Sequence, residues 1–490
     1  MNHKRLSARG ALAPLFTSLF AALVLAGCST TPTFEPAAPL AFKELDGRWA
    51  ALRPAEAQAR GEWWKSFADP LLDDLVARAD RNNTSIQLAA ARLAQARALL
   101  RSIDADRLPQ LGLNGGANRQ SASPALSTTA AGNVFNAGLG ASYEPDLFSR
   151  LAGASNAAAR EAQSPEALVQ STRLLVQSDV AQTYFGLRAL DAERALVRQT
   201  AVAYRDTLHL TERRRAAGDV AELDLARVRT EVASTESQAL ALDRRRAELE
   251  HALAVLLGEL PSALTLTERL ADKAGRTGGN DGTEGNDRSG ALPQVPPGVP
   301  STVLARRPDV AAAQRTMQAA QARVGTAQAA WFPDVSLTAS GGFASADLGD
   351  LLKWSARAWG VGALLSLPIF DGGRREAGVQ SANAQWDTAA AGYRGQVLVA
   401  FRDVEDQLSS LRLLADQATA QAQAVDSASR ATVFSTSRYR NGYVSQLELL
   451  DARRSELANR RQALQVRSAQ YQSTIGLIRA LGGGWGTTPV

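Results

Sequence analysis

The chain contains a long internal duplication, so whatever its first half builds must be built again by its second half. Matching residues recur at a single offset of 224 positions: Pro109 and Pro333, Asp179 and Asp403, Gly218 and Gly442. An offset of this length indicates a duplicated structural unit, because solenoid repeats recur every 20 to 50 residues or so. We therefore expect function to depend on the architecture that the two copies form together.

The first residues have the pattern of a secretory signal that ends in a lipid attachment site. Three basic residues precede an apolar stretch from Ala11 to Ala26, which is shorter than the ~20 residues of a membrane-spanning helix. The LAGC motif that ends at Cys28 resembles the lipobox of bacterial lipoproteins. We expect Cys28 to carry the N-terminal lipid, including palmitate. Ser29 follows it, and the resemblance to that lipoprotein class implies that, without Asp at this place, the default address is the outer membrane. The alternative is an ordinary signal peptide that happens to contain a cysteine.

Composition excludes nucleic acid as an expected partner and disulfides as a source of stability. The chain has 54 Lys and Arg against 49 Asp and Glu, and since three basic residues belong to the signal, the mature excess is two charges. A charge balance this even gives no electrostatic reason to bind nucleic acid. The one cysteine cannot form an intrachain disulfide, so stability must come from packing and assembly.

The sequence offers few residues for catalysis or metal binding. His209 and His251 lie in long helical stretches, where we expect them on the helix surface. Phosphate-binding loops and the HExxH, CxxC and GxSxG motifs are absent from the sequence. We therefore expect no enzyme, no bound metal and no cofactor apart from the lipid on Cys28.

Two helical hairpins of unusual length are predicted. Strong helix formers such as Ala, Leu, Gln and Arg fill four stretches: about Gly153 to Arg215, Ala221 to Leu257, about Arg374 to Arg440, and Val444 to Leu481. At 1.5 Å per residue a run of about 65 residues reaches roughly 100 Å. Gly218 and Gly442 lie between the paired stretches, where a left-handed residue ends a helix before the chain reverses. A coiled-coil spacer is an alternative that helices alone leave open.

Four short segments between the helices alternate with a period of two, which predicts strands. They begin at Leu111, Phe135, Val335 and Trp359. Each has one apolar face, one small or polar face and about 10 residues, the length that a tilted strand needs to cross a bilayer. Phe135, Tyr143 and Trp359 are candidates for the membrane interface. Half-buried strands in a soluble sheet are the alternative, which the lipoprotein signal disfavours.

The strand count implies that several copies assemble. A sheet in lipid cannot leave unpaired edges, and closed membrane barrels start at about eight strands, whereas one chain offers four. Two, three or four subunits satisfy this argument.

Several motifs in order resemble the lipoprotein branch of the TolC-type outer-membrane factors, which includes NodT- and OprM-like efflux channels. The resemblance covers nearly all of the mature chain. The motifs are WWKSFADPLLDDLVARA from Trp63, YEPDLFSR from Tyr143, LPQVPPGVPSTVLARRPDV from Leu292, LPIFDGGRR from Leu367 and RYRNGYVSQLELLDARR from Arg438.

The resemblance implies a homotrimer that mixes α and β structure. Twelve strands, four from each chain, form an outer-membrane β-barrel, and the long helical hairpins form a periplasmic α-barrel with an equatorial belt around it. The chain is then the passive outer-membrane channel of a tripartite efflux system, opened when a periplasmic adaptor and an inner-membrane pump dock on the hairpins.

Positions that match the hairpin tips of the family are candidate aperture and adaptor residues: Tyr439, Gly442, Leu447, Glu448, Asp451, Gly218, Leu223 and Asp224. Glu448 and Asp451 are three residues apart and so share a helix face. If that face points inward, a symmetric assembly has rings of carboxylates, for which Arg438, Arg440 and Arg453 are candidate partners. Because Arg227 replaces Asp451 in the first copy, we expect one hairpin to form the constriction and the other mainly to meet the adaptor. Ordinary solvated helix charges are the alternative.

The sequence divides into a signal peptide, two repeats and short connecting parts. The expected boundaries are 1–27 for the signal, 28–81 for the lipidated N-terminal segment and equatorial packing, 82–270 for the first repeat, 271–300 for a linker, 301–482 for the second repeat and 483–490 for the tail. Each repeat is expected to contain a helix, a β-hairpin and a long helical hairpin. A Gly- and Asp-rich insert from Asp272 to Ser289 departs from the family pattern and is interpreted as a loop near the equatorial belt.

The main alternative function is a structural lipoprotein that scaffolds the cell envelope without forming a pore. It accounts for the lipobox and the helices but has no use for four alternating strands. An enzyme is the third possibility, which no constellation of residues supports.

Overall fold

The computed structural model describes residues 61–120, 132–268, 292–293 and 306–483. Cys28, the signal and the insert from Asp272 to Ser289 lie outside the described residues. Contacts divide the described residues into two compact units: unit 1 comprises those of Leu93–Ser164 and Ala313–Tyr393, and unit 2 comprises those of Arg48–Arg92, Pro165–Ala312 and Arg394–Val490. Each unit therefore contains segments of both sequence copies, and the repeat boundaries expected from the sequence stay a prediction.

The helices repeat at the offset found in the sequence. The pairs are α3 (Thr84–Ala105) with α7 (Pro308–Ala329), α4 (Arg150–Ala216) with α8 (Arg374–Arg440), and α5 (Glu222–Leu256) with α9 (Gln446–Ala480). Helices α4 and α8 have 67 residues each, and α5 and α9 have 35 each. In every pair both ends are displaced by the same 224 positions, which confirms the internal repeat.

The long helices end within a few residues of the expected positions because local signals terminate them. Ser445 caps α9 by accepting a hydrogen bond from the Glu448 N–H at 3.3 Å. Both His209 on α4 and His251 on α5 are exposed, as expected. Among the described helices, none is both long enough and apolar enough to cross a membrane.

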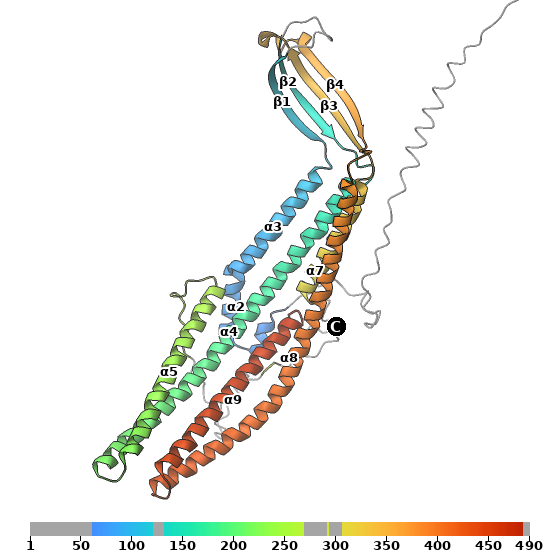
Figure 1. Cartoon of the computed structure of the whole chain (residues 1–490). Helices are drawn as coiled ribbons and strands as arrows, with labels where there is room; N and C mark the ends of the chain where they lie inside the picture. The colour runs from blue at the N-terminus through green and yellow to red at the C-terminus, as the bar shows by residue number, and fades with distance from the viewer. Residues whose placement is uncertain (1–60, 121–131, 269–291, 294–305, 484–490) are drawn as a thin grey trace, which may run out of the picture. The chain divides into compact units, whose positions relative to one another are not determined.

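Unit 1 contains a single antiparallel sheet (Figure 1). Its strands are β1 (Gln110–Gln120), β2 (Gly132–Tyr143), β3 (Asp334–Ser345) and β4 (Arg357–Ser366), in the order β1-β2-β3-β4. All four strands were predicted by the period-two pattern. The central pairing of β2 with β3 joins the two sequence copies, and β1 and β4 are the edges of the sheet.

The register of the sheet places the apolar positions of all four strands on one face. Leu113 is opposite Leu139, Leu139 is opposite Gly341, and Gly341 is opposite Trp359. Residues directly opposite one another lie on the same face of an antiparallel sheet. On the other face, a Cβ on Gly342 would lie 2.3 Å from the carbonyl oxygen of Ala137, so the β2–β3 pairing requires glycine there.

Below the sheet, unit 1 is held together by polar contacts between helices. Ser155 on α4 donates a hydrogen bond to Asp104 on α3 at 2.5 Å, and the hydroxyl groups of Ser164 and Thr316 are 3.1 Å apart. The rings of Phe148 and Phe332 stack with their centroids 5.2 Å apart. These contacts tie the segments that flank the strands to one another.

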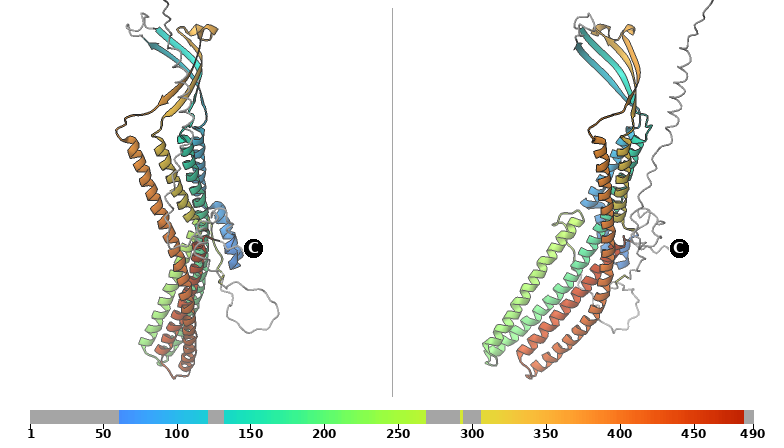
Figure 2. Two further views of the ribbon diagram at one scale, coloured as in Figure 1. Left: turned by 90° about the vertical axis from the view of Figure 1, so that its right-hand side faces the viewer. Right: turned by 45° about the vertical axis from the view of Figure 1, so that its right-hand side comes forward.

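Unit 2 has its main hydrophobic core where a short 3₁₀ helix (Trp63–Phe67) and α2 (Pro70–Asn82) pack against α4, α5 and α9. Leu72, Leu75 and Tyr184 are fully buried in this core. The Tyr184 hydroxyl donates to Asp69 at 2.5 Å, and burial, with this bond, raises the Tyr184 pKa. Figures 1 and 2 show α4 beside α5 and α8 beside α9, which are the two predicted helical hairpins.

Candidate functional site at the helical hairpin tips

Each helical hairpin reverses direction at a glycine with a left-handed backbone. The φ angle is 82° at Gly218 and 75° at Gly442. The N–H of Tyr443 donates to the carbonyl of Arg438 at 2.9 Å, and the N–H of Asp219 donates to that of Arg214 at 2.9 Å. These bonds close a Schellman-type helix end, in which only glycine avoids the strain of a side chain. The conformation expected for both glycines is observed.

Helices α4 and α9 are joined behind the tips by buried polar contacts. The Gln446 amide donates to the hydroxyl of Thr211 at 2.8 Å, and Arg453 donates to the hydroxyl of Thr207 at 2.7 Å. Burial lowers the Arg453 pKa from its ordinary value. Because buried polar groups cost free energy unless they are paired, these bonds fix how the second hairpin lies on the first.

A small apolar cluster lies next to these bonds. Tyr204, Val228, Val232 and Leu450 form its buried members, from α4, α5 and α9. Burial raises the Tyr204 pKa to about 12, and its hydroxyl has no hydrogen-bond partner within the described residues. The tip region is therefore a packed unit of helices from both sequence copies.

The carboxylates expected at the second tip lie on the surface and pair locally. Asp451 is 3.2 Å from Arg454, three residues along the same helix, and Glu448 is 4.0 Å from Arg438. Arg454 also pairs with Glu231 on α5. The candidate partners were Arg438, Arg440 and Arg453, and among the contacts just given only Arg438 pairs with a carboxylate, that of Glu448.

The outcome for the remaining expected arginines has a physical reason. Arg453 points between the helices to Thr207, because positions 453 and 454 lie about 100° apart around the helix and only 454 shares the face of Asp451. Arg440 is exposed at the end of α8. Arg453 thus donates to Thr207 within the chain, and its candidacy as a partner of the carboxylates in an assembly stays a prediction. The i, i+3 spacing of Asp451 and Arg454 could have identified the partner that Asp451 has within the chain.

The first tip carries a different charge pattern at the matching positions. Asp224 pairs with Arg227 at 3.6 Å, so a cation stands where the second tip has Asp451. Leu223 is 60% exposed and Leu447 is 40% exposed. Both leucines are thus exposed at the tips, and their roles in the aperture or in adaptor docking stay a prediction.

Two tip residues that sequence reasoning did not select are also prominent. Tyr439, which was selected, is buried beneath Arg214, whose guanidinium carbon lies 5.3 Å from the ring centroid. Tyr443, which the sequence analysis did not select, directly follows Gly442 and is 74% exposed. Gln446 was missed because a buried amide in a helix has no signature in the sequence until its partner Thr211, 235 positions away, is located.

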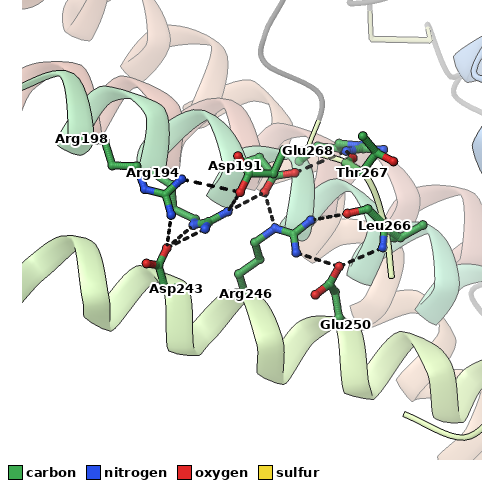
Figure 3. Close-up of polar contacts among 10 residues, drawn as sticks. Asp191, Arg194, Arg198, Asp243, Arg246, Glu250, Leu266, Thr267 and Glu268 are labelled. Carbon is green, nitrogen blue, oxygen red and sulfur yellow. Dashed lines mark hydrogen bonds and ion pairs between the residues drawn. The ribbon is translucent and has the colours of Figure 1, made fainter. Parts of the chain in front are cut away.

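A cluster of charged side chains braces the first hairpin farther from the tip (Figure 3). Asp191 on α4, with a side chain only 2% exposed, accepts a hydrogen bond from Arg246 on α5 at 2.8 Å. Arg194 donates to Asp243 at 2.7 Å. Although burial opposes it, hydrogen bonding to Arg194 holds the Asp243 pKa below its usual range.

The same cluster anchors the segment that follows α5. Arg246 donates to the carbonyl of Leu266 at 2.7 Å, and Glu250 accepts the Leu266 N–H at 3.0 Å. Arg194 reaches Glu268 at 2.5 Å. The chain thus leaves the hairpin at a fixed point before the sequence insert begins. Among the described residues, this cluster included, no group of His, Cys, Asp and Glu has the arrangement of a metal site.

Comparison with known proteins identifies the protein family to which a chain with these hairpins and strands belongs. A sequence model described as "Outer membrane efflux protein" matches the chain twice, over residues 75–259 and 299–483. The chain is 33% identical over 475 residues to the solvent efflux pump outer membrane protein SrpC of Pseudomonas putida, covering 95% of this chain and 97% of the relative. It is also 33% identical over 480 residues to the outer membrane protein OprJ of Pseudomonas aeruginosa, covering 96% and 95%.

A solved structure extends the similarity to three dimensions. The outer membrane protein VceC of Vibrio cholerae matches with a TM-score of 0.76 at 28% identity, covering 86% of this chain and 99% of that one. The two matches of the family model span all four strands and both helical hairpins. The chain therefore belongs to the outer membrane efflux protein family, whose members are the outer-membrane channels of efflux pumps in Gram-negative bacteria.

Proposed function

We propose that this channel works as a homotrimer whose pooled strands close a twelve-stranded barrel. The observation that carries the proposal is the four-stranded sheet with two free edges, β1 and β4, and one apolar face. In a bilayer the backbone groups of free edges must find partners, and pairing β4 of one copy with β1 of the next provides them. Three copies satisfy the minimum of about eight strands and agree with the assembly that the family resemblance implies.

We further propose that the helical hairpins of the three copies form the periplasmic duct and that transport through it is passive. The relatives are channel and efflux proteins, not enzymes. The chain then contributes a path, and a pump in the inner membrane supplies the energy. The N-terminal lipid on Cys28 would tether each copy to the outer membrane.

The hairpin tips are the proposed docking site for the periplasmic adaptor. The tips expose apolar side chains, Leu223, Leu447 and Tyr443, next to charged ones. Apolar groups ringed by charges are typical of protein interfaces. The proposed aperture and adaptor residues are Tyr439, Gly442, Leu447, Glu448, Asp451, Gly218, Leu223 and Asp224.

The two tips are proposed to have different roles because their charges differ. The second tip has Glu448 and Asp451 where the first has Asp224 and Arg227. A threefold axis turns a surface carboxylate into a ring of three, which favours cations in a narrow path. The second hairpin is therefore assigned to the constriction and the first mainly to the adaptor.

Cargo selection is assigned to the pump and not to this channel. Relatives with nearly equal identity to this chain are named for different cargo: SrpC for solvents at 33% and CusC for cations at 31%. A wide duct has no pocket in which one substrate is recognised.

The test is the single-channel conductance of the detergent-extracted protein in a planar bilayer, with its native mass determined in parallel. A trimer with small, mostly closed currents supports a gated export duct. A monomer or dimer without current contradicts the proposal and favours a structural lipoprotein that scaffolds the envelope. A trimer that is permanently open supports the channel and contradicts the assignment of a gate to the hairpin tips.

A further inference from the structure

The segment that follows β4 presents two large apolar side chains to its surroundings. Ile369 is 93% exposed and Phe370 is 91% exposed, the highest fractions among the exposed large apolar residues of the described chain. They are consecutive residues in the segment between β4 and α8. Exposed apolar patches of this kind mark surfaces that are covered in the working protein.

Hydrogen bonds order the turn that directly follows these two side chains and so hold one end of their segment. Asp371 accepts the N–H of Gly373 at 3.0 Å and the Arg375 side chain at 2.7 Å. The guanidinium of Arg375 in turn lies 4.6 Å from the ring centroid of Trp331. A segment held at one end loses less conformational entropy when its side chains bind a partner.

A hollow of matching character lies at the end of α3. It has a volume of about 540 Å³ and is lined by Arg101, Asp104, Ala105, Arg107 and Leu108. Leu108 is 62% exposed and provides an apolar surface, while the arginines provide a polar rim. The hydrogen bond from Ser155 holds Asp104 to α4. The hollow is therefore a supported feature of unit 1.

The strand order of the sheet determines which copy can bring Ile369 and Phe370 to this hollow. Strands β1 and β4 are the two edge strands of the sheet. Because every neighbouring pair of strands is antiparallel, β1 and β4 run in opposite directions. When β4 of one copy pairs with β1 of the next, the C-terminal end of β4 meets the N-terminal end of β1. Ile369 and Phe370 follow that end of β4, and Leu108 precedes that end of β1.

We propose that Ile369 and Phe370 of each copy insert into the hollow at the end of α3 of the neighbouring copy. The partner is a second copy of this chain, so this inference rests on the proposed trimer. The contact locks each junction between sheet and helices to the next one around the ring. It thereby supplies an apolar anchor beside the backbone hydrogen bonds between the edge strands.

The test expresses two differently tagged chains together in one cell. One carries Phe370→Cys and the other carries Leu108→Cys, and mild oxidation follows purification. Since a disulfide needs Cα atoms about 4.4 to 6.8 Å apart, a bond between the two tags reports an inter-copy contact. The matched control replaces Phe370→Cys with Leu352→Cys, an exposed apolar position in the loop at the opposite end of β4. Native Cys28 is common to both pairs.

The outcomes separate this inference from the trimer itself. A disulfide between tags with Phe370→Cys, but not with Leu352→Cys, supports the insertion. A trimer of correct native mass without that disulfide overturns the insertion, leaves the apolar pair to lipid, and keeps the proposed function. An unmodified chain that is not a trimer overturns the proposed function.

A second measurement does not depend on cysteine chemistry. Phe370→Asp is expected to lower the temperature at which the trimer dissociates on a native gel, while Leu352→Asp leaves it unchanged. Equal dissociation temperatures for the two variants overturn the insertion.

Discussion

Replacing Gly442 with valine tests whether the geometry of the second tip matters for docking. The residue has φ of 75°, and a Cβ there would meet no atom within 4 Å, so the cost comes from the backbone alone. A side chain in the left-handed region costs about 1 to 2 kcal/mol. That is a factor of roughly 5 to 30 in the population of the native turn. We expect Gly442→Val to weaken adaptor docking and export while the trimer stays assembled.

Hydrogen exchange and export measure this effect together. Amide exchange over residues 439–443 should accelerate by roughly 5- to 30-fold, and cells should retain more of a fluorescent pump substrate. Gly442→Asn is the matched control, since asparagine tolerates the left-handed conformation better than other side chains, and its effect should be smaller. Normal export and unchanged exchange in the valine variant would refute the reasoning.

Three further outcomes follow from the contacts. Asp451→Ala should raise the single-channel conductance in a planar bilayer, and an unchanged conductance would count against a carboxylate gate. Asp191→Ala should lower the free energy of unfolding by about 1 to 3 kcal/mol, because it removes the buried carboxylate that Arg194 and Arg246 both contact while their other partners remain, whereas Glu268→Ala, at a half-exposed carboxylate, should cost less than about 1 kcal/mol in the same denaturation assay. The folded structure holds the pKa of Asp243 below that of the unfolded chain, which is about 4. The ionised Asp243 side chain therefore stabilises the folded protein above that pH, and this contribution is lost as the pH falls through the folded pKa. Thermal melts should therefore show a shallower acid destabilisation in Asp243→Asn than in the wild type, and equal slopes would be the contrary result.

The helices and strands could be predicted because their signals are local and occur twice. The expected run from Arg374 to Arg440 is the observed α8, and the expected end at Arg215 is one residue from the end of α4. Runs of helix formers that stop at a glycine determine such boundaries. The alternation that predicted β2 and β3 required no knowledge of partners, because the side chains of a strand alternate in any sheet.

The contacts at the tips could not be predicted in the same way. Thr211 and Gln446 are hydrogen-bonded across 235 positions, and neither is unusual for a helix. Arg453, a candidate partner for the tip carboxylates, donates within the chain to Thr207 on α4, which the sequence does not indicate. A helix face is assigned to the core or the surface only when the neighbouring helix is in place.

The duplication, the long hairpins, the strands and the left-handed glycines can be read from the sequence, because each depends on a residue and its near neighbours. The folded arrangement was needed to show that β2 pairs with β3 across the two copies, that Asp191 is buried among arginines, and that Ile369 and Phe370 are exposed. These features depend on which segments come together in space, and burial and charge pairing are properties of that arrangement, not of any one segment.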